Sequence, residues 1–155
     1  MKMSEKYELP LPIQSVWQSL NDVEVLKKSI PGCEELVKKN DQKLNAKVKL
    51  KIGPVSATFS GIVELTDLNP PFSYTISGSG HGGLAGSAQG IAYVELIQLN
   101  NDDITILSYS VDASVNGKLA QLGSRLIEST AKKLAKKFFE EFVKIIQMNA
   151  KNIIQ

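Results

Sequence analysis

Apolar residues recur at several different spacings along the chain, and each spacing predicts a different element. Residues 3–9 form a short run that ends at a proline, and the apolar residues of 13–20 then follow at intervals of three or four. The first run predicts a strand, and the second predicts a helix with proline in its first turn. Asp22 is typical of the N-cap of a second short helix, residues 23–29, which an Ile-Pro-Gly sequence ends.

Beyond Cys33 the apolar and polar residues alternate strictly, as in half-buried antiparallel strands. The runs of this kind are residues 44–52, 55–65, 76–82, 88–96 and 105–115. Turn-forming residues separate them, among them Gly53 and Pro54 and the polar residues 100–103. We therefore expect consecutive hairpins.

From Lys118 helical spacing persists to about Ile146, which predicts roughly 43 Å of helix with Asn116 as its cap. Its apolar residues recur every four positions, so the apolar stripe drifts by about 40° per step. Two interpretations remain open. Either the helix crosses a twisted sheet and then the two short helices, or its C-terminal half, with three phenylalanines, lies on a partner or a membrane.

One strand, two short helices, a six-stranded meander and a long terminal helix are the elements of a helix-grip fold. We expect an α+β protein in which a curved antiparallel sheet of about seven strands wraps around the C-terminal helix. No repeat, linker or low-complexity segment divides the sequence, so residues 1–155 are predicted to form a single domain.

Composition and charge exclude several classes of function. The formal net charge of +2 is too small to indicate a nucleic-acid partner. Cys33 and His81 are the only residues of their types, so neither an internal disulfide nor a Cys/His zinc site is expected. No spacing pairs an acid, a base and a nucleophile, so we predict no catalytic residue, metal or cofactor. The absence of a signal-peptide core predicts a cytoplasmic protein.

Six of the eleven glycines lie within residues 74–90, and Gly78, Gly80 and Gly83 match the dinucleotide-binding pattern G-x-G-x-x-G. A phosphate-binding loop of this type must open a helix, whose N-terminal N–H groups face the anion. The residues after Gly83 lead into a strand instead. The sequence therefore argues against nucleotide binding.

The face of the strand on which these glycines lie is more informative than their number. Gly78 and Gly80 share one face of a strand, and Gly90 shares a face of the next strand with Ala88. If the turn falls at residues 83–85, both faces belong to the inner side of the sheet, while His81 points outward. The glycines then serve sheet curvature and close approach of the helix, or they leave a cavity, and the two interpretations are compatible.

Several stretches together resemble the family of the carbon monoxide dehydrogenase G subunit (CoxG), within the START-like, or SRPBCC, superfamily. They are NDVEVLKKSIPGCEEL (21–36), KIGPVSATFSGIVEL (51–65), DLNPPFSYTISGSGHGGLAGSAQG (67–90) and GKLAQLGSRLIESTAKKLAKKFFEEF (117–142). The resemblance implies a helix-grip fold with a deep hydrophobic cavity for a lipid or a quinone-like molecule. It also implies an accessory role beside a molybdenum-containing carbon monoxide dehydrogenase or related hydroxylase, and peripheral contact with the cytoplasmic membrane.

The family has no catalytic signature, so only cavity positions carry over to this sequence. On the side of the short helices they are Trp17, Leu26 and Ile30; on the sheet they are Phe59, Gly61, Ile76, Gly78, Ala88, Gly90, Ala92 and Tyr109; on the long helix they are Leu122, Arg125, Leu126 and Ser129. Two alternatives to a non-catalytic binding protein stay open. One is a START-like enzyme of cyclase or hydrolase type, and the other is a structural adaptor with a collapsed cavity.

Overall fold

The computed structural model describes residues 1–99 and 103–154, with side chains to residue 150. Most of the turn predicted at 100–103 lies outside the described residues. Seven strands form one antiparallel sheet in the order β1-β7-β6-β5-β4-β3-β2. The strands are β1 (Lys2–Leu9), β2 (Cys33–Asn40), β3 (Lys43–Ile52), β4 (Val55–Asn69), β5 (Ser73–His81), β6 (Ser87–Gln98) and β7 (Thr105–Asn116). The predicted meander is thus confirmed.

Two short helices, α1 (Ile13–Leu20) and α2 (Val23–Ser29), follow the first strand as predicted. Pro12 precedes the first turn of α1. The carboxylate of Asp22 accepts hydrogen bonds from the backbone N–H groups of Glu24 and Val25, at 2.9 and 3.3 Å. These bonds satisfy two of the N–H groups that a helix start leaves unpaired, so the predicted cap is confirmed.

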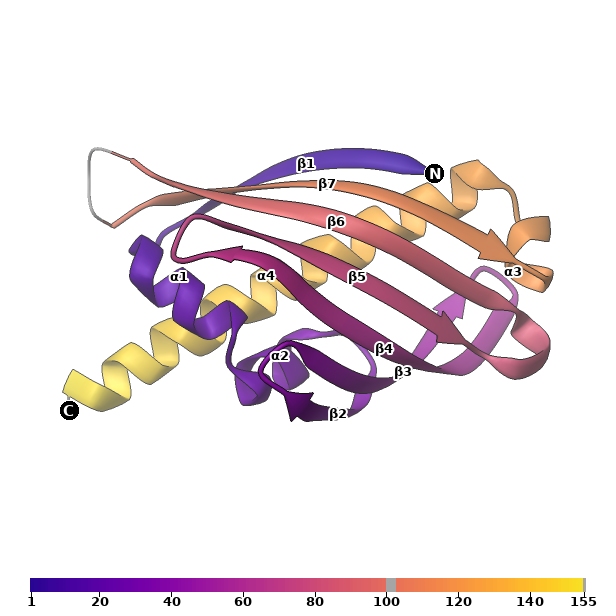
Figure 1. Ribbon diagram of the computed structural model, residues 1–155, viewed down its shortest axis with the longest axis horizontal. Coiled ribbons are helices and arrows are strands. Elements are labelled where there is room, and N and C mark those ends of the chain that lie inside the picture. Colours follow the sequence, from indigo (N-terminus) through magenta and orange to yellow (C-terminus); the bar gives the residue numbers. More distant parts are fainter. Residues whose placement is uncertain (100–102, 155) are drawn as a thin grey trace.

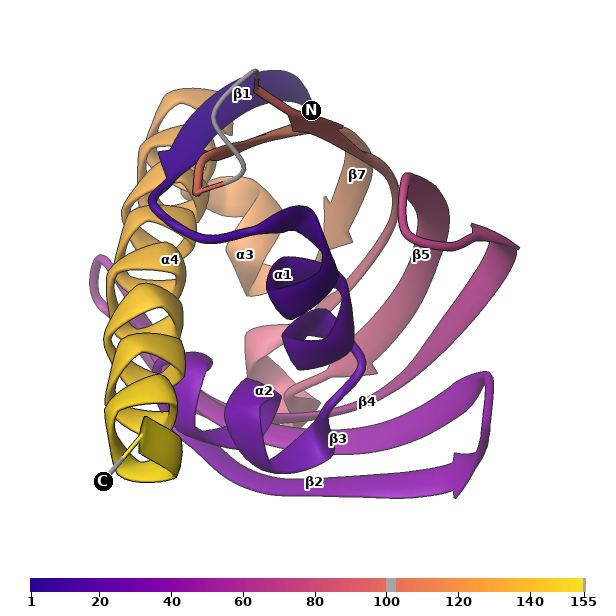
Figure 2. The ribbon, with the colours of Figure 1, turned by 90° about the vertical axis from the view of Figure 1, so that its left-hand side faces the viewer.

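The sheet curves around one side of the last helix, α4 (Ser124–Ile154), which crosses the sheet diagonally behind the strands in Figure 1. Figure 2 shows the sheet turning from β1 at the top to β2 at the bottom, with α4 across its open side. Helices α1 and α2 stand at the near end of this view, and α2 packs against α4. This is the helix-grip arrangement that the order of elements predicted.

The long helix differs from the prediction at its start. A separate turn, α3 (Lys118–Gln121), precedes α4, and the residue before α3 is Gly117 rather than the predicted cap Asn116. Gly123 adopts a φ of +89°, in the left-handed region that interrupts a helix, and α4 begins directly after it. The sequence prediction of one continuous helix from residue 118 was therefore wrong.

The three phenylalanines of α4 belong to the core. Phe142 is fully buried, and the Phe139 ring lies between the strands and the helix, with its centroid 4.4 Å from that of Tyr7. Phe138 is half-buried and stacks on Phe142. The alternative in which these phenylalanines lie on a membrane or partner is thus contradicted, and the drift of the stripe reflects successive packing on sheet and short helices. Among the described residues, no helix is long and apolar enough to cross a membrane.

Candidate functional site

The inner face of the glycine-rich hairpin is formed by the residues that the alternation of side chains along its two strands predicted. Gly78 pairs with Gly90, Gly80 with Ala88, and Ile76 with Ala92, so small residues oppose one another across β5 and β6. The connection is a 3₁₀ turn, η1 (Gly83–Ala85), and β6 follows it. The strand that the sequence predicted after the glycines is thus confirmed, and a three-residue turn offers no helix N-terminus to a phosphate.

The glycines of the inner face serve two different purposes. A Cβ atom on Gly61 would lie 2.6 Å from the carbonyl oxygen of Ser79, and one on Gly90 would lie 3.1 Å from the Cβ of Ala113. Close strand approach in the curved sheet therefore requires or favours glycine at these positions. A Cβ on Gly78 would meet nothing nearer than 3.8 Å. The missing side chain at Gly78 leaves space instead.

That space is part of an apolar cavity of about 490 Å³ between the sheet and the first half of α4, here called the outer cavity. Its sheet side is formed by residues of β3 to β7, and its helix side comes from α3 and α4. The principal inward side chains are Val48, Leu50, Ile52, Phe59, Val63, Val115, Leu119, Ile127, Thr130, Ala131 and Leu134. Among the described lining residues, Thr130 is the only polar side chain that the helices contribute.

A second apolar cavity of about 310 Å³, the inner cavity, lies toward the α1 and α2 end of the sheet. Its described lining contains no Lys, Arg, His, Asp or Glu. Leu26 and Ile76 line it, together with Ala92, Phe138 and Phe139. Ile30 and Val63 line both cavities, so the two spaces adjoin at these side chains.

Most of the cavity residues predicted from the sequence are placed on these walls. Phe59, Gly61, Gly78, Ala88 and Gly90 line the outer cavity; Leu26, Ile76, Ala92 and Tyr109 line the inner one; Ile30 lines both. Trp17 is absent from both linings. Its ring instead meets Tyr74 edge-on, with the centroids 5.4 Å apart, so Trp17 stands behind the wall of the inner cavity.

The four positions predicted on the long helix do not line either cavity. Arg125 and Ser129 are exposed, and Leu126 packs over the β3–β4 turn, within 2.8 Å of where a Cβ on Gly53 would lie. Leu122 precedes the break at Gly123 and is only half-buried. The residues of α4 that do line the cavities are Ile127, Thr130, Ala131 and Leu134 in the outer cavity and Phe138 in the inner one. Leu122 and Leu126 begin the same four-residue series as Thr130 and Leu134, but the drift of this series along the helix turns its first members away from the cavity.

Two buried tyrosines line the inner cavity, and their hydroxyl groups differ in what they contact. The hydroxyl of Tyr109 donates a hydrogen bond to the carboxylate of Glu5 on the neighbouring β1. Burial, and then the hydrogen bond and the charge of Glu5, raise the pKa of Tyr109 far above its ordinary value. Burial alone raises the pKa of Tyr74, which is 3% exposed. Both phenols therefore stay protonated at neutral pH.

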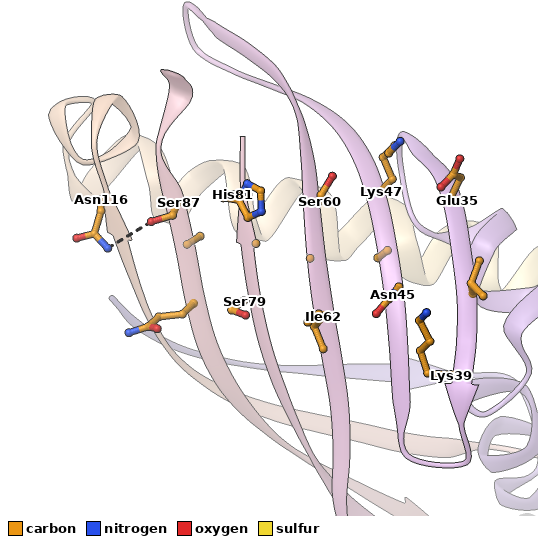
Figure 3. Close-up of a pocket in the computed structure, with 16 residues that line it drawn as sticks. Glu35, Lys39, Asn45, Lys47, Ser60, Ile62, Ser79, His81, Ser87 and Asn116 are labelled. Carbon is orange, nitrogen blue, oxygen red and sulfur yellow. Dashed lines mark hydrogen bonds between the residues drawn. The ribbon is translucent and has the colours of Figure 1, made fainter. Parts of the chain in front are cut away.

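The outer face of the sheet carries a larger hollow, of about 590 Å³, that the sequence did not predict (Figure 3). Polar side chains of β2 to β7 surround it, and Asn116 Nδ2 donates to Ser87 Oγ at 3.5 Å. His81 is exposed here, as its phase predicted. Polar and charged side chains make up more of its lining than of either apolar cavity, so it offers less apolar contact to a hydrophobic ligand.

Cys33 is half-buried, and its thiol donates to the Glu35 carbonyl oxygen at 3.4 Å. Burial raises the pKa of this thiol, against a smaller opposing effect of Lys27. It is therefore a weak nucleophile at neutral pH. Within residues 1–99 and 103–154, no three His, Cys, Asp or Glu side chains come together as a metal site would need.

Comparison with known proteins gives one family and one fold. The family model for the G subunit of carbon monoxide dehydrogenase (CoxG) matches residues 6–147. The crystal structure of a conserved protein from Geobacillus kaustophilus is 31% identical, covers 96% of both chains and superposes with a TM-score of 0.90. None of the curated proteins matches the sequence.

More distant structures share the fold alone. The Zhui aromatase/cyclase from Streptomyces sp. R1128 is 11% identical over 97% of this chain and 95% of its own, with a TM-score of 0.70. A START superfamily protein from Mycobacterium smegmatis is 17% identical over 93% and 98%, with a TM-score of 0.64. Since the CoxG model spans nearly the whole sequence and the fold is that of START-like proteins, the chain belongs to the CoxG family, that of the carbon monoxide dehydrogenase G subunit.

Proposed function

We propose that the protein is a non-catalytic accessory protein that holds a hydrophobic, lipid-like or quinone-like ligand between its sheet and α4. The observation that carries this proposal is the pair of adjoining cavities, of about 490 and 310 Å³, whose inward side chains are almost all apolar. Both volumes fall within the range of ligand pockets, roughly 300–1,000 Å³. Such walls favour a ligand that gains free energy by leaving water.

The partner that we propose is a molybdenum-containing carbon monoxide dehydrogenase or a related hydroxylase. Membership of the CoxG family supports this assignment. The ligand would then exchange electrons or be handed over at the partner enzyme, and this chain would contribute binding rather than chemistry. The protonated thiol of Cys33 and the protonated phenols of the inner cavity agree with a site that binds without reacting.

We further propose that the protein works at the cytoplasmic face of the membrane through the end that carries the glycine loop. Leu84, at the tip of this loop, is 89% exposed. The loop packs on the start of α3, where a Cβ on Gly117 would lie 2.8 Å from the Cα of Gly86. We define the glycine-loop end as residues 51–56, 82–87 and 116–126.

The charges of the glycine-loop end suit an anionic lipid surface. Its three segments contain Lys51, Lys118 and Arg125 and no Asp or Glu. Each such cation near a bilayer with anionic lipids contributes about 1 kcal/mol of attraction. An exposed leucine at the same end of the protein as three cations is a suitable peripheral contact. Phe59, which lies against Gly82, links this loop to the outer cavity.

Extraction of a quinone from vesicles tests ligand carriage directly. The full chain is incubated with phosphatidylglycerol vesicles that contain a long-chain quinone, the vesicles are removed, and quinone is measured in the protein fraction. Trp17, the only tryptophan, contacts the wall of the inner cavity, so its fluorescence should be quenched as the quinone enters. A protein fraction free of quinone, with unchanged Trp17 fluorescence, would contradict the proposal of quinone carriage.

The enzyme partner needs a separate experiment. Affinity purification of the tagged full chain from a lysate of its own cells should enrich the polypeptides of a molybdenum hydroxylase, relative to a tag-only control. If repeated purifications enrich none of these polypeptides, the partner assignment fails while ligand carriage stands.

A further inference from the structure

One buried tyrosine that lines the inner cavity has a hydroxyl group without a hydrogen-bond partner among the described residues. Tyr74, near the start of β5, is 3% exposed and lines this cavity. Its ring contacts Trp17, but its hydroxyl makes no hydrogen bond with any described residue. Tyr109 on the same wall differs, because its hydroxyl is engaged by Glu5.

The Tyr74 hydroxyl is not completely enclosed by protein atoms, so a hydrogen-bond acceptor of a ligand can reach it. In the described residues that are not exposed, every completely enclosed side-chain nitrogen or oxygen has a hydrogen-bond partner. The Tyr74 oxygen has none, so it is not completely enclosed, and the space that Tyr74 lines is the inner cavity. Leaving a buried donor unpaired costs about 1–3 kcal/mol, which an acceptor that entered the cavity would recover.

We propose that Tyr74 donates a hydrogen bond to the polar head of the ligand, and that this head is an uncharged oxygen acceptor such as a ketone, an ester or another carbonyl. This inference rests on the proposed function and names the class of ligand. The head occupies the inner cavity, and the apolar tail passes Ile30 and Val63 into the outer cavity.

The charges around the inner cavity explain why the head is neutral. No cationic side chain of the described residues lines the cavity, so a carboxylate head would lose its hydration without gaining a counter-charge. Behind this wall the carboxylate of Glu5 accepts the hydrogen bond of the Tyr109 hydroxyl, and its negative charge would repel an anion. A carbonyl needs one donor, and Tyr74 supplies one.

Three probes of equal chain length separate these head groups: 2-undecanone, undecane and undecanoate. Their affinities for the full chain are measured by displacement of a fluorescent apolar dye. The ketone and the alkane differ in hydration, so the informative quantity is the ratio of their two affinities. The hydrogen bond should make this ratio about three- to tenfold higher in the wild type than in a variant without the donor. The wild type should bind undecanoate more weakly than the ketone by at least about tenfold.

Tyr74→Phe keeps the ring and its contact with Trp17 but removes the donor. In this variant the affinity for the ketone should fall about three- to tenfold while the affinity for undecane stays within about twofold of the wild type. Tyr93→Phe is the matched control, because Tyr93 is 47% exposed on the outer face of the sheet. It should leave all three affinities unchanged.

A second readout needs no comparison of affinities. The carbonyl stretch of bound 2-undecanone should shift to lower frequency in the wild type, as for a hydrogen-bonded ketone, and return toward the free value in Tyr74→Phe. An identical carbonyl frequency and an identical ketone affinity in both proteins would overturn the assignment of Tyr74 alone. If the folded wild type binds neither ketone nor alkane, the proposed function fails together with it.

Discussion

Replacing Gly78 with leucine tests whether the space between the sheet and α4 is empty. Gly78 lies in an extended strand, and a Cβ there would meet no atom nearer than the Ile62 carbonyl oxygen at 3.8 Å. The rest of the leucine side chain would enter the outer cavity, which Gly78 lines. The substitution therefore adds apolar volume without moving the backbone.

The expected gain in the free energy of unfolding follows from three contributions. Burying a leucine side chain stabilises by roughly 1.5–3 kcal/mol. Removing a glycine from the middle of a strand adds about 0.5–1 kcal/mol, and loss of the leucine's rotamer freedom takes back about 0.5–1 kcal/mol. We expect Gly78→Leu to unfold with a free energy roughly 1.5–3 kcal/mol higher than the wild type, both freed of ligand.

Urea unfolding, followed by circular dichroism, measures this difference. Gly61→Ala is the control on the same wall, because its Cβ would lie 2.6 Å from the Ser79 carbonyl oxygen and must displace the backbone. It should destabilise the protein although it adds only one methyl group. If Gly78→Leu is also destabilising, by the roughly 1–3 kcal/mol typical of an overpacked core, the cavity is collapsed and the reasoning is refuted.

Three further predictions concern the membrane contact, the inner cavity and the core. Leu84→Asp should reduce sedimentation with phosphatidylglycerol vesicles at least about fivefold, and wild-type binding should weaken as salt rises; equal sedimentation of both proteins would exclude the glycine loop as the contact. Burial raises the pKa of Tyr74 in the folded protein, so above about pH 10 the unfolded chain binds fewer protons than the folded one. The free energy of unfolding should therefore fall by about 1.4 kcal/mol per pH unit. Urea unfolding at about pH 9 to 11.5 should show a smaller fall for Tyr74→Phe than for the wild type, and equal falls would contradict this assignment. Phe142→Ala should lower the free energy of unfolding by about 3–5 kcal/mol because the ring is fully buried, whereas Met148→Ala, at a position 63% exposed, should change it by less than about 0.5 kcal/mol; similar urea midpoints for both variants would place Phe142 outside the core.

The sheet side of the cavity was predictable because strand geometry has a fixed period of two. Once Gly78 and Gly90 are placed on strands, their faces follow from parity, and a short turn between them puts both faces on the same side. The purpose of each glycine was not predictable, since it depends on the distance to the neighbouring strand. Gly61 and Gly78 both occupy inward positions of alternating strands. A Cβ on Gly61 would collide with the neighbouring strand, whereas a Cβ on Gly78 would not.

The helix side was less predictable for a physical reason. An apolar stripe drifts around a helix, so which of its members face the sheet depends on where the helix begins. The left-handed conformation of Gly123 moves the start of α4 to Ser124, which the sequence pattern did not reveal. The sequence could not predict that the Tyr74 hydroxyl is without a hydrogen-bond partner among the described residues. Tyr74 and Tyr109 are both tyrosines on inward strand positions, and only the fold shows that Glu5 reaches one of them and not the other.

The most direct test of the central claim is native mass spectrometry of the full chain purified from its own cells without detergent. We predict a fraction of molecules that carry one additional neutral, carbonyl-bearing lipid, and we predict that Gly78→Leu, purified in parallel, carries much less of it. A wild-type spectrum with only the mass of the chain, together with no uptake of quinone from vesicles, would contradict the claim that this protein holds a hydrophobic ligand.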